Sequence, residues 1–366
     1  MINNYLIAGL MSGTSVDGLD ISILKTDGIN QTKILEEKFF KFDLSYQNRI
    51  FRATEKFNVK EINKSKIEEL NQLVTLQHFK HLKKIPLIDT VDYVGFHGQT
   101  IYHNIDKKIS IQLGDPQTLS NLLQKRVVFN FRKKDIEHGG HGAPIAPIYH
   151  KHILQNLNFK LPSVMINIGG VTNLTFWDGN ELIGFDVGPG NGLIDYVIQK
   201  NTRFKFDNLG KLASKGKIIP SILDTFFNDE FFRKKYPKSL DKFYFLKKYN
   251  KLDKSYHIFD ILASLVEVSV KSIVLAFNLL PSLPKNLTIV GGGVKNLYMM
   301  ERLKKNLVNE ININQNHPLN PDFIESQLMA YLTARVVNKM PITYPLTTGV
   351  PKPMSGGEIF LPTKSH

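Results

Sequence analysis

The sequence contains no cysteine among its 366 residues. This absence excludes disulfides and thiolate metal sites, and it fits a reducing compartment. No apolar run reaches the roughly 18 residues that cross a bilayer, because polar side chains interrupt the longest candidate, 261–280. The first residues lack a basic region followed by an apolar core, so we expect no signal peptide. We therefore expect a cytoplasmic protein that makes no use of a membrane.

Negative charge is also scarce, with 33 acidic against 47 basic residues and a formal net charge of +14. Such an excess raises nucleic acid as a partner. The lysines are scattered, however, with only local pairs such as Lys133-Lys134 and Lys247-Lys248. No RNP, zinc-finger or basic-zipper pattern accompanies them. We therefore expect no nucleic-acid partner, although a basic surface would attract small anions.

The length exceeds what one hydrophobic core usually supports, which predicts two lobes. Near the N-terminus, the apolar run 6–10 leads into the turn 12–15, and alternation resumes over 19–23. The run 164–168 repeats this pattern, with Gly169-Gly170 as its turn and a returning strand over 174–177. The two hairpins lie about half the chain apart, which indicates an internal duplication with one hairpin in each lobe.

Other segments predict helices and a third glycine turn. Apolar residues at helical spacing over 262–280 predict a long helix that stops at Pro281. The strand 287–290 precedes Gly291-Gly292-Gly293, after which a helix begins. A further helix is predicted over 324–335, and the segment 204–256 is interpreted as a helical insertion.

The glycine turns suit the binding of phosphate. Glycines let several backbone N–H groups converge on one anion, and the hydroxyls of Ser12, Thr14 and Ser15 would add donors. This is not a Walker loop, which would require a lysine and a following helix. A tight β-turn without a ligand would explain either hairpin alone. The two hairpins and the Gly-Gly-Gly turn together favour a nucleotide site.

A series of motifs then follows one order along nearly the whole chain. They are MSGTSVDGLD at 11–20, GFHGQT at 95–100, QLGDP at 112–116, NFRKKD at 130–135, GGHGAP at 139–144, NIGGVTNL at 167–174, GFDVGPGN at 184–191 and GGG at 291–293. This series resembles the signature of the anhydro-N-acetylmuramic acid kinases. The chain departs from it at 238–242, where Leu240-Asp241 replaces the usual Thr-Gly, so details of the insertion stay open.

The resemblance implies an α/β fold of the actin-like superfamily. Two ribonuclease-H-like lobes, as in actin, hexokinase and acetate kinase, would close over ATP in a central cleft. We expect an N-terminal lobe over 1–135, with the tail 337–366 packed back on it, and a C-terminal lobe over 136–336. The resemblance also implies a homodimer.

The implied cofactors are ATP and Mg²⁺. The residues expected to bind ATP share the glycine turns, and they are Gly13, Thr14, Ser15, Val16, Asp17, Gly18, Leu19, Asp20, Gly169, Gly170, Gly291, Gly292 and Gly293. Asp17 and Asp20 are also candidates for water-mediated contact with Mg²⁺. The alternative interpretation of either aspartate is a hairpin residue that faces solvent.

Asp186 is the candidate catalytic base, on a constrained turn after a strand. The alternative is an aspartate that caps the helix predicted over 191–198. In the reaction that the resemblance implies, water attacks C1 of a 1,6-anhydro amino sugar, the C1–O6 bond opens and O6 accepts the γ-phosphoryl group. Asp186 would accept the proton of that water, as in an inverting glycosidase. The product would be N-acetylmuramic acid 6-phosphate, made during peptidoglycan recycling.

Four residues are candidates for binding the sugar. His97 and Gln99, at the end of a predicted strand, would reach its hydroxyls. Arg132 would pair with the lactyl carboxylate, since a guanidinium suits bidentate recognition. The alternative interpretation of Arg132 is an arginine in a loop that faces solvent. Glu325 opens the last long helix and would face the sugar or favour the helix dipole.

Two other functions of the same fold stay open. A tRNA-modifying ATPase would hold a metal with a pair of histidines. His138, His141, His150 and His152 are close in sequence, but they lack fixed ligand spacing and are interpreted as ordinary histidines. A nucleotide-driven switch or chaperone-like ATPase is the second alternative.

Overall fold

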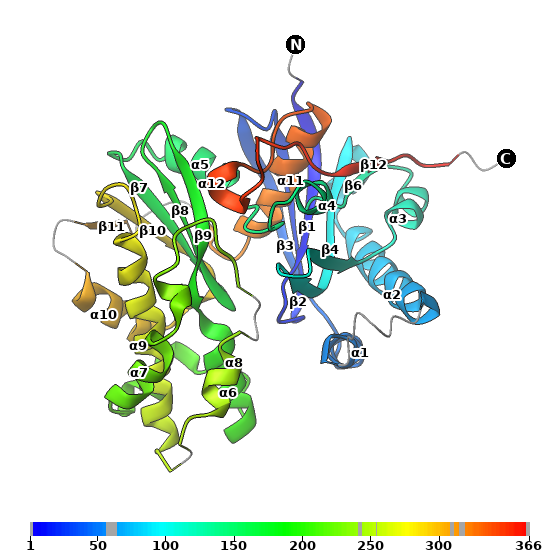
Figure 1. Cartoon of the computed structure of the whole chain (residues 1–366). Helices are drawn as coiled ribbons and strands as arrows, with labels where there is room; N and C mark the ends of the chain where they lie inside the picture. The colour runs from blue at the N-terminus through cyan, green and yellow to red at the C-terminus, as the bar shows by residue number, and fades with distance from the viewer. Residues whose placement is uncertain are drawn as a thin grey trace. The chain divides into compact units, whose positions relative to one another are not determined.

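The computed structural model describes residues 3–55, 64–240, 244–253, 255–307, 311–314 and 319–363. The chain forms two compact units (Figure 1). Unit 1 contains 1–152, 322–345 and 349–366, and unit 2 contains 153–321 and 346–348.

Unit 1 is built on a sheet with the strand order β12-β6-β4-β1-β2-β3. Its first three strands, β1 (Tyr5–Ser12), β2 (Gly18–Thr26) and β3 (Thr32–Lys41), pair antiparallel. The strands β4 (Tyr93–Asn104) and β6 (Arg126–Phe129) continue the sheet in parallel with β1. The outer half of β4 also pairs with β5 (Ile109–Leu113).

Helices cover both faces of this sheet. Ala8 and Leu10 on β1 point to the face where α1 (Leu44–Glu55), α2 (Lys64–Leu82) and α3 (Pro116–Leu123) pack. Gly9 points to the other face, and a Cβ built on it would come within 2.0 Å of the Ser326 carbonyl oxygen. The absence of side chains there lets α11 (Ile324–Val337), orange in Figure 1, lie directly on β1, β2 and β4.

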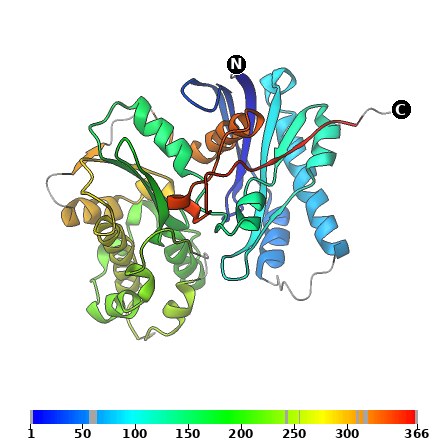
Figure 2. The ribbon, with the colours of Figure 1, turned by 45° about the horizontal axis from the view of Figure 1, so that its top comes forward.

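Two short helices and the C-terminal strand complete unit 1. The helix α4 (Lys133–Glu137) follows β6, and α5 (Pro147–Asn156) passes from unit 1 into unit 2 between His152 and Ile153. The strand β12 (Glu358–Phe360) pairs antiparallel with β6, and Figure 2 shows this red segment along the edge of the sheet.

Unit 2 repeats the sheet of unit 1. Its order is β11-β10-β7-β8-β9. The strands β7 (Ser163–Ile168), β8 (Val171–Trp177) and β9 (Leu182–Pro189) are antiparallel, while β10 (Asn286–Val290) and β11 (Asn312–Asn314) run parallel to β7. Three antiparallel strands followed by two parallel ones thus occur in both units. This is the ribonuclease-H-like, actin-like arrangement predicted from the sequence, and it confirms the internal duplication.

One face of the second sheet is covered by helices. Its apolar side chains form a core with α6 (Asn191–Asn201), α7 (Pro220–Phe227), α8 (Leu246–Asn250), α9 (Ile258–Phe277) and α10 (Leu297–Asn306). The helix α9 is the long helix predicted before Pro281, and it ends three residues earlier than predicted. The short helix α12 (Pro345–Thr348) belongs mostly to unit 2.

The two compact units are divided differently from the predicted lobes. Residues 136–152 and the helix α11 belong to unit 1, whereas the predicted C-terminal lobe ran over 136–336. The helix α11 belongs to unit 1 because it packs closely on Gly9. The sequence alone does not reveal this contact. In the part of the chain that the structure describes, no helix is both long and apolar enough to span a membrane.

Candidate functional site

The first candidate element is the turn between β1 and β2, which spans residues 13–17. Val16 N–H donates to the Gly13 carbonyl at 3.1 Å and closes the turn. Thr14, Ser15 and Asp17 are exposed, whereas Ser12 and Val16 are buried. The turn therefore presents its hydroxyl groups to solvent from two buried anchors.

Val16 itself has an unusual backbone. Its φ of 53° lies in the left-handed region, which a β-branched residue rarely adopts because its Cβ crowds the chain. The side chain is only 2% exposed and packs in the core of unit 1. Core packing thus holds a strained residue within the turn, as is common at ligand sites.

Gln99 anchors the turn from the neighbouring strand β4. Its Oε1 accepts a hydrogen bond from Ser12 Oγ at 2.8 Å, and its Nε2 donates to the Gly13 carbonyl at 3.1 Å. The side chain is fully buried. His97 and Gln99 both lie within β4 (93–104) rather than at the end of the strand, so this part of the prediction was wrong. Both amide atoms serve the turn.

His97 and Arg132 lie together in unit 1. His97 Nδ1 contacts the Gly98 carbonyl at 3.0 Å, so this nitrogen carries the proton, and Nε2 accepts from Arg132 Nε at 3.2 Å. Arg132 Nη1 donates to the Gly142 carbonyl at 2.8 Å. Burial, and then the Arg132 guanidinium, lowers the pKa of His97 to about 3. The imidazole is therefore neutral and orients a half-buried guanidinium.

In unit 2, three glycine segments meet at the end of β7. The N–H groups of Gly190 and Gly192 donate to the Gly170 carbonyl, both at 3.1 Å, and that of Asn191 donates to the Gly169 carbonyl at 2.8 Å. A Cβ on Gly190 would meet the Gly169 carbonyl oxygen at 2.3 Å. The start of α6 thus rests directly on the turn between β7 and β8, which only glycine permits.

The Gly-Gly-Gly turn approaches the same end of β7. Gly291 has a φ of 83°, and a Cβ there would lie 2.2 Å from Asn167 Oδ1. A Cβ on Gly293 would lie 2.3 Å from the Ile168 side chain. Gly292 begins the short 3-10 helix 292–295, and the predicted helix follows as α10. The structure therefore brings Gly169, Gly170 and this turn together within unit 2.

Asp186 lies inside β9, opposite Asn173 on β8, and is 8% exposed. Its Oδ2 accepts a hydrogen bond from Leu240 N–H at 2.7 Å, and its own N–H donates to the Lys238 carbonyl at 3.0 Å. The turn position predicted for Asp186 was wrong, because the strand continues to Pro189. The capping alternative fails as well, since Gly190 occupies the N-cap of α6 without a side-chain cap.

Asp17, Asp20 and Glu325 are the remaining carboxylates of the prediction, all in unit 1. Asp17 is exposed and its Oδ1 accepts from Ser15 Oγ at 2.6 Å. Asp20 is half-buried on β2, opposite Met11. Carboxylate oxygens of this kind suit Mg²⁺, which keeps several of its own waters. Glu325 lies half-buried in the first turn of α11, as predicted.

The histidines near residue 140 form no metal centre in the structure. Over the described ranges, no group of three or more His, Cys, Asp or Glu side chains could hold a metal ion. His150 and His152 are buried in α5, and His152 Nδ1 contacts the Ile29 carbonyl at 2.9 Å. These contacts are structural.

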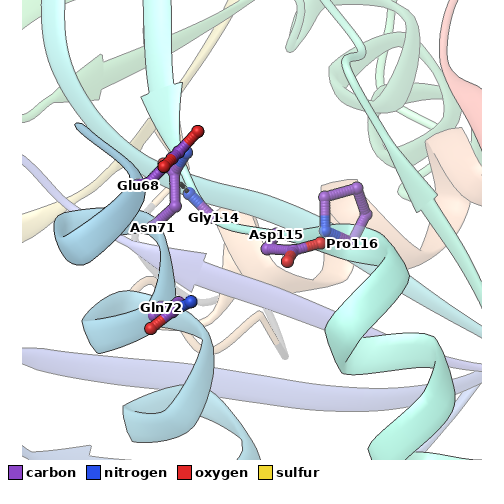
Figure 3. Close-up of a pocket in the computed structure, with 6 residues that line it drawn as sticks. All are labelled: Glu68, Asn71, Gln72, Gly114, Asp115 and Pro116. Carbon is purple, nitrogen blue, oxygen red and sulfur yellow. Dashed lines mark hydrogen bonds between the residues drawn. The ribbon is translucent and has the colours of Figure 1, made fainter. Parts of the chain in front are cut away.

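A shallow polar pocket lies elsewhere in unit 1, between α2 and the start of α3 (Figure 3). Its lining residues are Glu68, Asn71, Gln72, Gly114, Asp115 and Pro116. Asn71 Oδ1 accepts from Gly114 N–H at 3.0 Å, and Asp115 Oδ1 caps α3 by accepting from Gln117 and Thr118 N–H. These polar groups hold the loop of the QLGDP motif in place, so the motif has a structural role here.

The sequence did not predict three contributors to the site. Gln99 holds the turn, and Lys238 and Leu240 bind Asp186 through their backbones. The departure from the family pattern at 238–242 was the one available signal for the contacts of Asp186. Asp241 and Lys242, which belong to the same departure, lie outside the described residues.

Comparison with known proteins gives one family over nearly the whole chain. The family model of anhydro-N-acetylmuramic acid kinase matches residues 4–362. Proteins of that name from Pelagibacter ubique, Zymomonas mobilis and Rhodopseudomonas palustris strain BisB18 are 38%, 34% and 33% identical. These matches cover 96–97% of this chain and 97–99% of the relatives.

Among solved structures, a ROK family glucokinase from Streptomyces griseus, in complex with glucose and AMPPNP, is 10% identical. The match covers 90% of this chain and 99% of that one, with a TM-score of 0.40. From the family model and the three relatives together, the chain belongs to the anhydro-N-acetylmuramic acid kinase family.

Proposed function

We propose that this protein is an ATP-dependent kinase that opens 1,6-anhydro-N-acetylmuramic acid with water and phosphorylates it. The products are N-acetylmuramic acid 6-phosphate and ADP, and the enzyme is a phosphotransferase with an alcohol group as acceptor. Membership of the family supports this function. The observation that carries the chemistry is the buried Asp186 carboxylate, held at 2.7 Å by Leu240 N–H.

Asp186 is the proposed general base. Its carboxylate accepts one proton from a water molecule while the water oxygen attacks C1 of the sugar. The C1–O6 bond breaks, and its electron pair stays on O6. O6 attacks the γ-phosphorus of ATP, the bond to the β,γ-bridging oxygen breaks, and ADP leaves. A backbone N–H donor stabilises the charged form of a carboxylate, which is the form that a base requires.

The glycine turns are the proposed phosphate sites. In unit 1 we assign Gly13 to Asp20 to ATP, with the exposed Thr14 and Ser15 hydroxyls as donors. In unit 2 we assign Gly169, Gly170 and Gly291 to Gly293. Converging amides stabilise the charge on a transferring phosphoryl group. Mg²⁺, when bound, would neutralise phosphate charge, and Asp17 and Asp20 are the proposed partners of its waters.

The Arg132 guanidinium is the proposed partner of the lactyl carboxylate. His97 fixes its Nε and Gly142 fixes its Nη1, which leaves the group oriented before the sugar arrives. His97 and Glu325 stay proposed sugar contacts. For Gln99 we propose a role in the turn instead, because Ser12 and Gly13 occupy its amide.

The remaining proposals concern the setting of the enzyme. We infer a homodimer in the cytoplasm that contributes to peptidoglycan recycling, in line with the family. The two alternative functions, tRNA modification and a nucleotide-driven switch, gain no support from the comparisons.

Replacement of Asp186 by Asn tests the proposed base. Loss of a general base costs roughly 10²- to 10⁴-fold in rate, so we expect turnover of the anhydro sugar to fall by that factor. The affinity for ATP should stay near the wild-type value. The assay incubates the protein with ATP, Mg²⁺ and the anhydro sugar and measures the phosphosugar.

The matched control is Asp224→Asn, an exposed position on α7 of the same unit. It should retain wild-type turnover. Near-wild-type rates in Asp186→Asn would remove Asp186 as the base. ATP hydrolysis without any phosphosugar in the wild-type protein would refute the proposed reaction itself.

A further inference from the structure

The segment 238–240 lies along the outer edge of β9, the last strand of the second sheet. Two hydrogen bonds attach it to Asp186. The Lys238 carbonyl accepts from Asp186 N–H at 3.0 Å, and Leu240 N–H donates to Asp186 Oδ2 at 2.7 Å. The orientation of the proposed base therefore depends on where this segment is held.

The buried Lys238 side chain anchors this segment to the neighbouring residues Phe231 and Phe185. It is 3% exposed, and its Nζ donates to the Phe231 carbonyl at 2.9 Å. The Nζ lies 4.3 Å from the centroid of the Phe231 ring and 5.5 Å from that of Phe185. Phe185 directly precedes Asp186 on β9. The ammonium group thus joins the strand of the base to the 3-10 helix at 230–232.

A lysine in this position is costly unless its charge has partners. Burial lowers the pKa of Lys238 to about 8, Asp186 opposes that shift, and Lys234 adds to it. The group is therefore still protonated at neutral pH, where it attracts the Asp186 carboxylate. An apolar side chain would fill this site without the free-energy cost of removing a charge from water. We therefore infer that the ammonium group has a functional role.

We propose that Lys238 is a positioning residue for Asp186: its buried ammonium anchors the 238–240 segment on β9 and favours the ionised carboxylate. This inference rests on the proposed role of Asp186 as the base. It also explains why the departure from the family pattern at Leu240 is tolerated. The donor to Asp186 is a backbone N–H, which leucine supplies as well as threonine does.

The test compares Lys238→Met with Lys215→Met. Lys215 is the control in the same unit, because its Nζ also lies over a phenylalanine ring, that of Phe259 at 5.9 Å from the centroid, but its side chain is exposed. In Lys238→Met we expect kcat to fall about 10- to 100-fold, the usual effect of a slightly misplaced catalytic group. The KM for ATP should stay unchanged, and Lys215→Met should behave as the wild type does.

Two readouts separate positioning from a merely structural role. The acid limb of the pH profile of kcat should move to higher pH in Lys238→Met, because the carboxylate loses an attractive charge. Lys238→Arg keeps the charge and should leave that limb in place. Amide hydrogen exchange over 238–240 should be faster in Lys238→Met than in Lys215→Met.

A folded Lys238→Met with wild-type kcat, an unmoved acid limb or unchanged exchange over 238–240 would overturn the proposal. If Lys238→Met does not fold, Lys238→Arg decides, and a shifted acid limb in that variant would overturn it. Asp186→Asn is measured in parallel. An active Asp186→Asn refutes the base itself, whereas an inactive Asp186→Asn beside an unaffected Lys238→Met refutes only the role of Lys238.

Discussion

At the scale of single residues, the turn at 13–17, which we propose binds phosphate, depends on buried side chains. Ser12 and Val16 anchor it within the chain, and Gln99 binds it from a strand 87 positions away from Ser12. The exposed Thr14 and Ser15 are not among these anchors, and the Ser15 hydroxyl donates to the exposed Asp17 at 2.6 Å. A substitution at Gln99 should therefore act on the turn and not on the sugar.

Gln99→Leu tests this division of labour. The change leaves Ser12 Oγ and the Gly13 carbonyl without their partner, and a buried polar group that loses its partner costs about 1–3 kcal/mol. We expect a loss of unfolding free energy of that size and a higher KM for ATP, with the KM for the sugar unchanged. Urea unfolding and steady-state kinetics measure the two effects.

Gln117→Leu is the control, since Gln117 Nε2 also donates to a backbone carbonyl, that of Leu361, far along the chain from the turn. It should keep the wild-type KM for ATP. A raised KM for the sugar in Gln99→Leu, with the KM for ATP unchanged, would return Gln99 to the sugar site.

These residues also show what the sequence could predict at this scale. The glycine turns could be predicted from local motifs, because glycine geometry is a property of short segments. The candidacy of Asp186 came from the order of motifs that resembles the family, and its role stays a prediction. The partners of Gln99 and Asp186 could not be predicted. They depend on the pairing of β4 with β1 and of 238–240 with β9, which unite distant segments.

At the scale of elements, the hairpins and helices were predictable because each has its own period of apolar residues. The placement of α11 was not predictable, because the strands contact it through glycines, which have no side chain. Gly9 and Gly95 lie beneath it, and a Cβ on Gly95 would come within 2.3 Å of Thr333 Oγ1. A glycine in a strand normally weakens it, but here it lets a helix backbone approach the sheet.

Gly9→Ala should therefore destabilise unit 1. The added methyl group has no room beside the Ser326 carbonyl, and overpacking of this kind typically costs about 1–3 kcal/mol. Gly13→Ala is the matched control for stability, because the nearest atom to its Cβ would be Ser15 Oγ at 3.6 Å. Thermal unfolding of both variants compares them. Equal melting temperatures would show that α11 shifts without cost.

At the scale of the whole molecule, the two units have the same sheet, but the pKa shifts of their titratable groups have opposite effects on stability in acid. Unit 1 contains the buried His78, His97 and His150 and the half-buried His103, and burial of the ring nitrogens is the main cause of their low pKa values. These values are about 4 for His78 and about 3 for His97, His103 and His150. Unit 2 contains Asp195, and burial, then repulsion by Asp207, raises its pKa to about 7.

The sign of each effect follows from proton linkage. Below pH 6.5 these histidines bind protons in the unfolded chain but stay neutral in the folded one. The free energy of unfolding of unit 1 therefore falls by on the order of 1 kcal/mol per histidine for each further pH unit. Asp195 does the reverse. Its folded carboxyl binds a proton near pH 7, whereas the unfolded one does so near its ordinary value of 3.8. Asp195 therefore contributes stability to unit 2 as the pH falls from 7 to 5.

We expect two thermal transitions that separate between pH 7 and pH 5. The only tryptophan, Trp177, lies on β8 of unit 2, so its fluorescence follows that unit while calorimetry records both. The Trp177 transition should rise or hold as the other falls. Asp195→Asn should abolish the gain in unit 2 and leave unit 1 unchanged, because an amide has no proton to bind. Two transitions that fall together in the wild-type protein would show that the units unfold as one body.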